Sequence, residues 1–422
     1  MQDNEKKPAL RFKGFTDPWE QRKLGEICDF ITKGATPTTY GFSWQPDGVP
    51  FFRNDSIKDN VFVFGEFSYI SEAANEVLKR SEVHGNDILI AITGDIGKVG
   101  IIPDTVEKAN INQHIARVRI RKEALPYFVY QYLASDDTQK EYQKIKTGLS
   151  MPQLSLEQVR DIVVKIPEFN EQGKIADCLR RIDTLITLHQ RKYEKLVNIK
   201  KSMLDKMFPK NGASVPEIRF KGFTDPWEQR KLAELTKTIT TGKSVNSDEG
   251  EVSDGDIGVL KTSCVSYDRF NPSESKPVVK SEQQLVKCAV EKDSVIVSRM
   301  NTPERVGACG YVSTDFPNLF LPDRLWKLKF QDTVDTYFVY MMLVSSAYKE
   351  KITSMASGTS GSMYNIPKET FLNLQLVIPA KIDEQKQLGR ILKKIDTLIT
   401  LHQRKLEKLQ NIKKSCLEKM FV

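Results

Sequence analysis

The chain repeats two blocks of its own sequence about half a chain apart. Residues 11–24 read RFKGFTDPWEQRKL, and residues 219–232 repeat all fourteen letters at an offset of 208. Residues 182–192 read IDTLITLHQRK and recur letter for letter at residues 395–405, at an offset of 213. Because an internal repeat fixes the architecture of a chain, we expect two similar halves related by a rough twofold.

The segments between the repeated blocks, residues 25–165 and 233–377, have nearly equal length but little sequence in common. A chain of 422 residues is long enough for two or three domains, each with its own core. Each half therefore combines a constant frame with a different insert. The predicted boundaries are a first globular domain at 1–165, a helical spacer at 166–210, a second globular domain at 211–377 and a second helical spacer at 378–422.

The composition is typical of a globular protein, with 40% hydrophobic and 28% charged residues. The chain has no run of about 20 apolar residues, the length that a membrane span needs, so no span is expected. The first ten residues lack the apolar core of a secretory signal. The closest two of the six cysteines, Cys288 and Cys309, are 21 residues apart, and no CxxC pattern occurs. We therefore expect a cytoplasmic protein with free thiols, no metal site and no membrane contact.

Each half ends in a long helix with apolar residues at alternating steps of three and four. This spacing continues for more than four heptads and predicts a coiled-coil seam. A helix of about 35 residues would be roughly 50 Å long, and the two copies can bury each other's seams if they pair antiparallel. Leu185, Leu188, Leu398 and Leu401 widen the stripe. The predicted seam includes Ile182, Ile186, His189, Tyr193 and Leu196 in the first helix, and Ile395, Ile399, His402, Leu406 and Leu409 in the second.

His189 and His402 occupy equivalent seam positions. No Asp, Glu or Cys accompanies them in the seam at the spacing of metal ligands. A polar seam residue that sets the register of the helix pair is the interpretation we favour over a metal or catalytic role.

The net charge of +8 is concentrated on these helices. Residues 174–210 contain ten Lys or Arg against four Asp or Glu, and residues 386–422 contain ten against three. The two segments carry +6 and +7, so the rest of the chain sums to −5, because 8 − 13 = −5. Such a concentration of positive charge attracts polyanions at long range, although a solvated helical face would look the same in sequence.

The repeated block at 11–24 and 219–232 has two possible roles. Its aromatic and basic residues could form a nucleic-acid platform, or they could anchor each globular domain to the helices. We favour the anchor, because a surface that discriminates between targets would not be identical in both halves. The residues that would make the anchor are Phe12, Phe15 and Trp19, and Phe220, Phe223 and Trp227.

Both inserts alternate short β-type runs with loops, which predicts an α/β fold. Apolar runs at 87–93 and 115–120 predict strands in the first insert, and runs at 294–299 and 325–330 take the corresponding places in the second. The sequence YFVY occurs in both inserts and begins a predicted helix in each. These few identities indicate one ancestral fold with divergent loops.

No catalytic motif survives inspection. Gly242-Lys243-Ser244 resembles the end of a phosphate-binding loop, but Lys237 stands where its first glycine is required. Asn271-Pro272-Ser273 lacks the aromatic residue of an amino-methyltransferase loop, and the chain has no HExxH motif, nucleophile elbow or carboxylate cluster. We therefore predict no catalytic residues, and no cofactor or metal bound by this chain.

The polar, basic and aromatic side chains of the insert loops are the candidate DNA contacts. Arg and Lys can bind guanine edges, Asn and Gln can bind adenine, and Ser and Thr can hold phosphates. For any single residue a solvated loop is an equally good interpretation. The candidates are Lys33, Thr36, Thr38, Tyr40, Arg53, Asn54, Lys98, Gln113 and His114 in the first insert, and Lys243, Ser244, Lys261, Ser263, Arg299, Asn301 and Arg324 in the second.

Several of these segments together resemble the specificity subunit of type I restriction–modification systems. They follow the family order and cover nearly the whole chain, twice. The second insert departs from the pattern, with TTGKSVN at 240–246 where the first has TKGATPT at 32–38. The matching segments of the first half are WEQRKL at 19–24, TKGATP at 32–37, VPFFRNDSI at 49–57 and DILIAITGDIGKVG at 87–100, with the repeated helix block IDTLITLHQRK.

The resemblance implies an α+β protein with two α/β target recognition domains in a pseudo-twofold arrangement, separated by two long antiparallel coiled-coil helices. Each domain would read one half of an asymmetric, bipartite double-stranded DNA sequence. Two methyltransferase subunits and two restriction subunits would be the partners, and they would bind S-adenosylmethionine, ATP and Mg²⁺. The alternative is a coiled-coil adaptor with two ligand-binding modules that are not specific for DNA.

Overall fold

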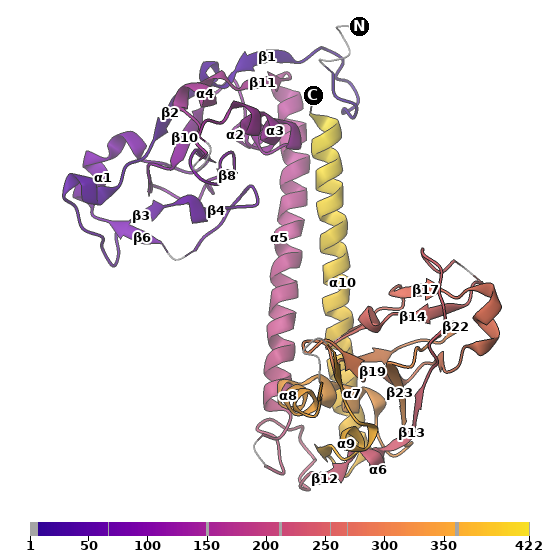
Figure 1. The fold of residues 1–422 in the computed structure, drawn as a ribbon. Coiled ribbons are helices and arrows are strands. Elements are labelled where there is room, and N and C mark those ends of the chain that lie inside the picture. Colours follow the sequence, from indigo (N-terminus) through magenta and orange to yellow (C-terminus); the bar gives the residue numbers. More distant parts are fainter. Residues whose placement is uncertain are drawn as a thin grey trace. The chain divides into compact units, whose positions relative to one another are not determined.

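The computed structural model describes residues 7–65, 67–148, 152–210, 213–253, 255–267, 269–358 and 363–421. The chain divides into two compact units, which are Met1–Gln190 with Arg404–Val422 (unit 1) and Arg191–Gln403 (unit 2). Each unit therefore contains one insert, one copy of the repeated anchor block and a part of each long helix (Figure 1).

A four-stranded antiparallel sheet of the same order forms the centre of each unit. In unit 1 the order is β2 (Cys28–Lys33), β10 (Ile115–Ile120), β7 (Ile88–Ala91) and β8 (Val99–Ile101). In unit 2 it is β13 (Thr236–Thr241), β23 (Leu325–Phe330), β19 (Ser294–Ser298) and β21 (Cys309–Val312). The strands predicted at 115–120 and 325–330 have their predicted bounds, and the one predicted at 87–93 is shorter. The α+β class is confirmed, and both inserts have one fold.

A second, smaller sheet in each unit contains a parallel pair of strands. In unit 1, β3 (Val49–Phe52) lies between β6 (Ser68–Ile70) and β9 (Asn110–Ile111) and runs parallel to β9. In unit 2, β14 (Gly258–Leu260) runs parallel to β22 (Phe316–Phe320), and β17 (Ser275–Pro277) and β18 (Ala289–Val290) complete the sheet. Because parallel strands end at the same edge, the loops that follow each pair emerge side by side.

The remaining strands form short two-stranded pairs. The hairpin of β4 (Ile57–Lys58) and β5 (Val61–Phe62) in unit 1 corresponds to that of β15 (Val265–Ser266) and β16 (Arg269–Phe270) in unit 2. Unit 2 also pairs β20 (Met300–Asn301) with β24 (Tyr364–Asn365).

Short helices pack beside the sheets, and two long helices follow the inserts. Unit 1 contains α1 (Glu72–Val77), α2 (Pro126–Leu133), α3 (Asp136–Ile145) and α4 (Leu156–Asp161), and unit 2 contains α6 (Leu232–Leu235), α7 (Thr336–Val344), α8 (Ser346–Ser354) and α9 (Lys368–Leu372). The repeated YFVY lies in α2 and α7 and is largely buried. The long helices are α5 (Phe169–Lys206) and α10 (Ile382–Met420). In the described part of the chain, no helix combines the length and apolarity that a membrane crossing needs.

The repeated anchor block closes each globular domain. Its EQRK residues form β1 (Glu20–Lys23) and β12 (Glu228–Lys231), which pair with β11 (Val163–Ile166) and β25 (Gln375–Ile378), the strands just before the long helices. Trp19 and Trp227 are buried in the cores, and Phe12 and Phe220 pack against them. These are the contacts of an anchor and not of an exposed platform.

An arginine of the anchor block forms a bidentate ion pair with a glutamate at the start of each long helix. Arg11 donates from Nε and Nη2 to the two carboxylate oxygens of Glu171, at 2.7 and 2.8 Å. Arg219 makes the same pair of bonds to Glu384 at the same two distances. Both carboxylates are buried. A buried carboxylate is stable only when it is paired, so the arginine fixes the anchor block to the helix.

The antiparallel pairing of the two long helices is seen within each unit. In unit 1, Met420 and Phe421 share a core with Ile175 and Leu179 of α5. Asp183, further along α5, bonds to Lys413, which precedes Met420 in α10, at 2.8 Å. The corresponding pair in unit 2 joins Lys200 to Asp396 at 2.7 Å. Met203, further along α5, packs against the core that contains Leu388 and Leu392, which precede Asp396 in α10. In both units later positions of α5 therefore contact earlier positions of α10, so the two helix segments run in opposite directions.

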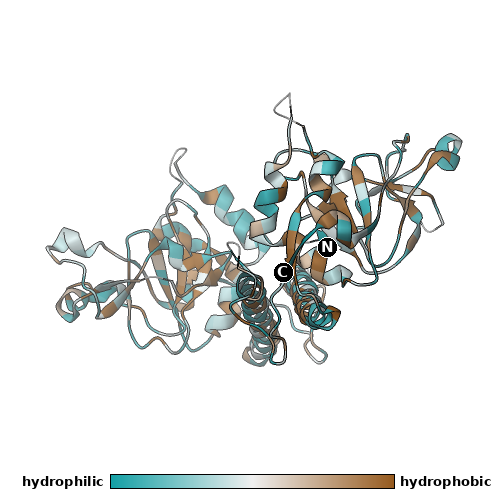
Figure 2. Cartoon of the chain, turned by 90° about the horizontal axis from the view of Figure 1, so that it is seen from below, coloured by the Kyte–Doolittle hydropathy of each residue, from teal (hydrophilic) through white to brown (hydrophobic). Residues whose placement is uncertain are grey.

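The predicted seam residues have mixed burial. Ile395 is buried, and Ile182, Ile186, His189, Tyr193, Leu196, Ile399, His402, Leu406 and Leu409 are partly buried. The four leucines expected to widen the stripe are instead exposed, because they lie beside the seam and no described element covers them. In Figure 2 hydrophobic residues gather among the strands and helices inside each unit.

A tyrosine from each YFVY sequence binds the long helices. Tyr127 of α2 donates to Asp183 at 2.6 Å, and the amide of Gln131 donates to the same carboxylate at 2.7 Å. In unit 2, Tyr337 of α7 donates to Asp396. Each aspartate therefore joins the globular domain, its own helix and the lysine of the other helix. This network explains why YFVY is among the few identities left between the inserts.

Candidate nucleic-acid interface

The loops that follow four strands gather at one edge of each globular domain. Loop cluster 1 is made by the loops after β2, β3, β7 and β9 in unit 1, and loop cluster 2 by those after β13, β14, β19 and β22 in unit 2. Backbone hydrogen bonds hold them together, such as Asn112 N to Phe52 O at 3.1 Å and Ile92 N to His114 O at 2.9 Å. All sixteen candidate residues lie in these loops or at the strand ends that lead into them.

In loop cluster 1, the structure brings Thr36, Gln113 and His114 together. Thr36 donates to Oε1 of Gln113 at 2.5 Å, and Nε2 of Gln113 lies 3.0 Å from Nε2 of His114. The approach depends on Gly34, because a Cβ at this position would lie 1.8 Å from the carbonyl oxygen of Ile111. A solvent-exposed amide is thus held in place by two neighbours, which prepares it to bind a base edge.

Arg53 and Asn54 follow β3 in the same cluster. The guanidinium of Arg53 lies 4.8 Å above the ring of Trp44 and donates to Ser68 at 2.8 Å. Asn54 donates to the carbonyl of Thr93 at 2.9 Å, which ties the loop after β3 to the loop after β7. Trp44, an exposed aromatic residue beside this arginine, was not among the residues predicted from the sequence.

The other candidates of the first insert are scattered over the cluster. Lys33 is exposed at the end of β2, and Thr38 and Tyr40 are exposed on the loop that follows it. Lys98 lies on the hairpin between β7 and β8 and forms an ion pair with Asp95 at 2.7 Å. A lysine already paired with a carboxylate is a weaker phosphate ligand, so Lys33 is the better candidate.

Loop cluster 2 brings Ser244, Arg299, Asp323 and Arg324 together. Ser244 donates to Oδ1 of Asp323 at 2.6 Å, and Nε of Arg299 donates to the backbone carbonyl of Asp323 at 2.8 Å. Arg324 and Lys243 are exposed and have no side-chain partner among the described residues. Two basic side chains are therefore available to DNA beside an oriented carboxylate.

The side chains of two candidates of the second insert form hydrogen bonds within the protein, and a third candidate is partly buried. Asn301 is buried and donates to Ser298 Oγ at 3.0 Å and to Thr262 O at 3.5 Å. Ser263 donates to Glu274 at 2.6 Å. Lys261 is partly buried at the end of β14. Asn301 and Ser263 hold the loops in place, and their sequence gave no sign of these partners.

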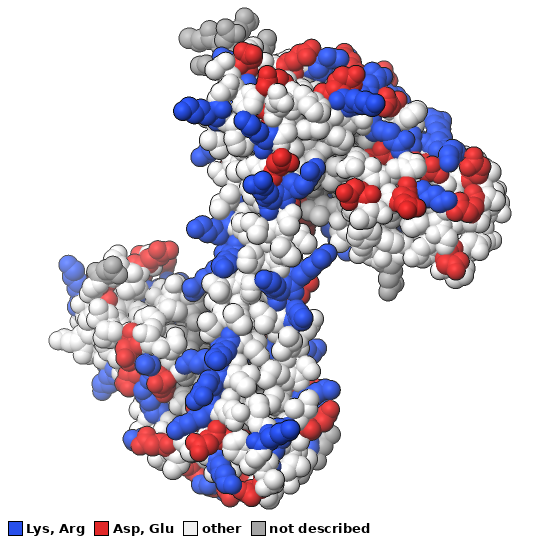
Figure 3. All heavy atoms as spheres, turned by 180° about the vertical axis from the view of Figure 1, so that it is seen from behind, with Lys and Arg blue, Asp and Glu red and all other residues white. Residues whose placement is uncertain are grey.

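The surface charge separates the helices from the globular domains. On the face shown in Figure 3, Lys and Arg follow the long helices with few acidic side chains between them. Acidic and basic side chains are mixed over the globular parts. A concentration of positive charge like that on the helices attracts polyanions at long range.

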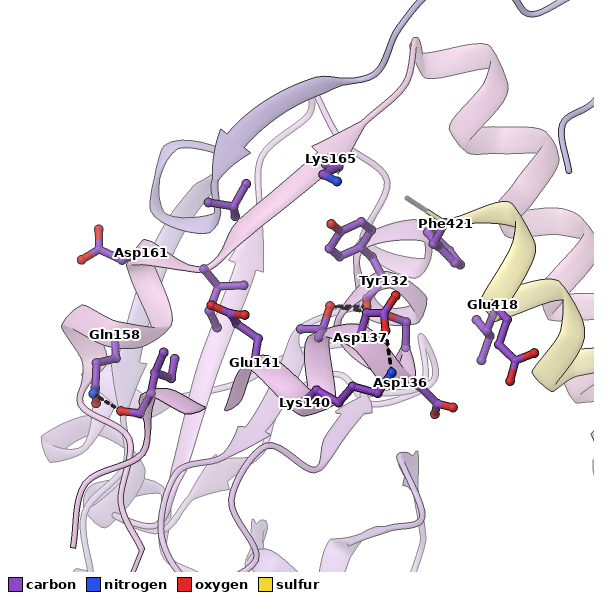
Figure 4. A pocket seen from close by; sticks show the side chains of 16 residues that line it. Tyr132, Asp136, Asp137, Lys140, Glu141, Gln158, Asp161, Lys165, Glu418 and Phe421 are labelled. Carbon is purple, nitrogen blue, oxygen red and sulfur yellow. Dashed lines mark hydrogen bonds and ion pairs between the residues drawn. The ribbon is translucent and has the colours of Figure 1, made fainter. Parts of the chain in front are cut away.

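A hollow of about 570 Å³ in unit 1 lies away from these loops, between α3, β11 and the last turn of α10 (Figure 4). Five carboxylates and two lysines line it: Asp136, Asp137, Glu141, Asp161 and Glu418, with Lys140 and Lys165. The excess of negative charge makes this hollow unfavourable for phosphate groups. Among the described residues, no group of three or more His, Cys, Asp or Glu could hold a metal ion.

Comparisons with known proteins show the family and the fold of the chain. The sequence model of the type I restriction modification DNA specificity domain matches residues 16–198 and 224–411. The MjaVIII type I restriction enzyme specificity subunit of Methanocaldococcus jannaschii is 23% identical over 410 residues, which cover 94% of this chain and 91% of that protein. The EcoBI specificity subunit of Escherichia coli is 29% identical over 178 residues, 41% of this chain and 36% of that protein. The solved S subunit of a type I restriction-modification system from M. genitalium has the same fold, with a TM-score of 0.68 at 14% identity over 99% of both chains.

Proposed function

The chain belongs to the type I restriction modification DNA specificity family, and from this premise we propose that its two units each read one half of a bipartite, asymmetric DNA target. Recognition of a DNA target is the role of this family, and its specificity subunits are non-catalytic. The observation that carries the proposal is the pair of loop clusters. They occupy the same edge of the same fold but present different side chains.

The long helices are the spacer in this proposal. At about 1.5 Å per residue, a helix of about 38 residues is roughly 57 Å long, which exceeds one turn of B-DNA, about 34 Å. The matched Arg–Glu and Tyr–Asp–Lys contacts fix each globular domain to the helices. The spacer would set the distance between half-sites, and its basic surface would lie near the DNA backbone.

The exposed leucines of the repeated helix block are the proposed docking sites of two methyltransferase subunits. Leu185 and Leu188 in unit 1 are 45% and 47% exposed, and Leu398 and Leu401 in unit 2 are 42% and 44% exposed. Apolar side chains exposed at equal positions of an exact repeat fit two copies of one partner. Two restriction subunits would complete the complex, and S-adenosylmethionine, ATP and Mg²⁺ would be bound by the partners.

The docking surface is tested by Leu188→Glu, alone and with Leu401→Glu. We expect native mass spectrometry to show one methyltransferase subunit lost in the single variant and both lost in the double variant. Thr187→Glu, an exposed neighbour on the same helix, is the control and should retain two. A complex that keeps both subunits in the double variant would refute this surface.

DNA recognition is tested by exchanging residues 25–165 for the insert of another family member. Mapping of methylated adenines should show that one half of the target changes and the other stays. The affinity of the methyltransferase complex for DNA should also fall steeply as salt rises, and the chain alone should transfer no methyl groups. A change in both halves, or a flat response to salt, would contradict the proposal.

A further inference from the structure

The recognition loops of the two units can be matched residue by residue, although their sequences do not align. His114 and Arg324 each immediately precede the strand β10 or β23. The carbonyl of each accepts a hydrogen bond from the residue after the equivalent strand, Ile92 N at 2.9 Å and Arg299 N at 3.1 Å. Residue 113 therefore corresponds to residue 323, and residue 114 to residue 324.

Two glycines support the same match. A Cβ on Gly34 would lie 1.8 Å from the carbonyl oxygen of Ile111, and a Cβ on Gly242 would lie 1.5 Å from that of Leu321. Both sites exclude any side chain. The segment TKGATPT at 32–38 therefore corresponds to TTGKSVN at 240–246. This assigns a structural equivalent to the segment of the second insert that departs from the family pattern in sequence.

The residue two positions after each glycine has one function in both units. Thr36 donates to the side chain of Gln113 at 2.5 Å, and Ser244 donates to the side chain of Asp323 at 2.6 Å. A hydroxyl thus orients the side chain at the same place in each fold. The orienting group is kept, whereas the oriented group changes from an amide to a carboxylate.

This change alters the hydrogen bonds that each unit can offer to a base. Gln113 presents both a donor and an acceptor, the pattern that matches the N7 and N6 edge of adenine. Asp323 is an acceptor, which matches the N4 amine of cytosine, and the exposed guanidinium of Arg324 matches the O6 and N7 edge of guanine. His114 is partly buried against Gln113 and, unlike a guanidinium, does not offer two parallel N–H donors.

We infer that residues 113–114 and 323–324 determine the base read in each half-site, with Gln113 selecting an A·T pair in one half and Asp323 with Arg324 selecting G·C in the other. This inference rests on the proposed function and assigns its specificity to two short segments. Thr36 and Ser244 are the positioning residues, because they act on the bases only through their neighbours.

The test exchanges the two pairs, as Gln113→Asp with His114→Arg, and separately as Asp323→Gln with Arg324→His. Each variant is assembled with its methyltransferase subunits and used to select from DNA with randomised half-sites. We expect the first variant to change a preferred A·T pair to G·C in one half-site only, and the second variant to do the reverse in the other. The preference at the affected pair should change by about 5- to 150-fold.

Thr36→Val and Thr36→Ser separate positioning from folding. The valine variant should lose preference at the A·T pair by roughly 10-fold, within the range of one good bidentate contact, while the serine variant retains it and both keep the other half-site. A wild-type complex without sequence preference would refute the proposed function itself. A specific wild-type complex whose exchanged variants keep the original bases, or bind no DNA at all, would refute this inference alone.

Discussion

The frame and the loops of the two units differ in how closely they match. Arg11 with Glu171 and Arg219 with Glu384 form the same two bonds at the same distances, although the partners are 160 and 165 residues apart in the chain. The loops share a glycine contact, an orienting hydroxyl and one equivalent backbone hydrogen bond, but they present different side chains. The frame that holds the two loop clusters is the same in both units, whereas the side chains of the loop clusters differ.

The difference separates two kinds of substitution. Changes in the frame should reduce stability and should leave the target sequence unaltered. Changes in the loops should leave stability alone and affect one half-site.

Arg11→Ala and Arg219→Ala should be the most damaging. Each removes the partner of a buried carboxylate, which costs about 3–5 kcal/mol when the charge is left unpaired. Urea unfolding should show a large loss for both variants, somewhat smaller for Arg219→Ala, because Glu384 keeps the hydrogen bond from the indole nitrogen of Trp227 at 3.3 Å. Arg22→Ala removes exposed ion pairs with Glu20 and Glu26 and is the control; exposed ion pairs contribute little to stability, so we expect no comparable loss. A large difference between the two frame variants would break the equivalence of the units.

Tyr127→Phe and Tyr337→Phe should cost less, since a hydrogen bond to a charged group contributes about 1.5–3 kcal/mol. The two effects should not be equal. Asp183 keeps the amide of Gln131, whereas Met341 occupies the corresponding position in unit 2 and offers no donor. We therefore expect the larger loss of unfolding free energy for Tyr337→Phe. Equal losses, or a larger one for Tyr127→Phe, would show that Gln131 does not support Asp183.

Lys200→Met and Lys413→Met remove the cross-helix ion pairs with Asp396 and Asp183. These pairs are partly exposed, so solvent screening limits their expected contribution to about 1 kcal/mol each. A double-mutant cycle with Asp183→Asn should show coupling to Lys413. No coupling to Lys200 is expected, because Lys200 bonds to the other aspartate.

Lys33→Ala and Lys243→Ala should have no measurable effect on stability, since both side chains are exposed. Each should weaken binding about equally for all sequences and reduce the salt slope by about 1, the behaviour of a phosphate contact. A change in the preferred bases would instead show that the lysine contacts base edges and not the phosphate backbone.

Much of the frame could be predicted from the sequence because its signals are local. The seam spacing predicted both long helices, and apolar runs gave the bounds of β10 and β23. The bond from Arg11 to Glu171 could not be foreseen, because no periodicity links residues so far apart. Arg11 does lie in the repeated anchor block, and the pair Glu171-Gln172 recurs as Glu384-Gln385 at the start of the second long helix, which was the available signal.

The candidate site was predicted less well than the frame. The loop residues were chosen by type, and type does not show whether a side chain is already occupied. Asn301 and Ser263 have partners inside unit 2, and Lys98 has Asp95. The correspondence of Gln113 with Asp323 depends on backbone hydrogen bonds and is invisible in an alignment of unlike loops.

The central claim is that the frame is shared and the inserts alone carry discrimination. The most direct measurement replaces residues 233–377 with a second copy of residues 25–165 and maps the methylated adenines that the complex leaves in DNA. Two identical inserts on an unchanged frame should recognise a target whose two halves carry the same bases. A target that keeps its original, unlike second half would contradict the account.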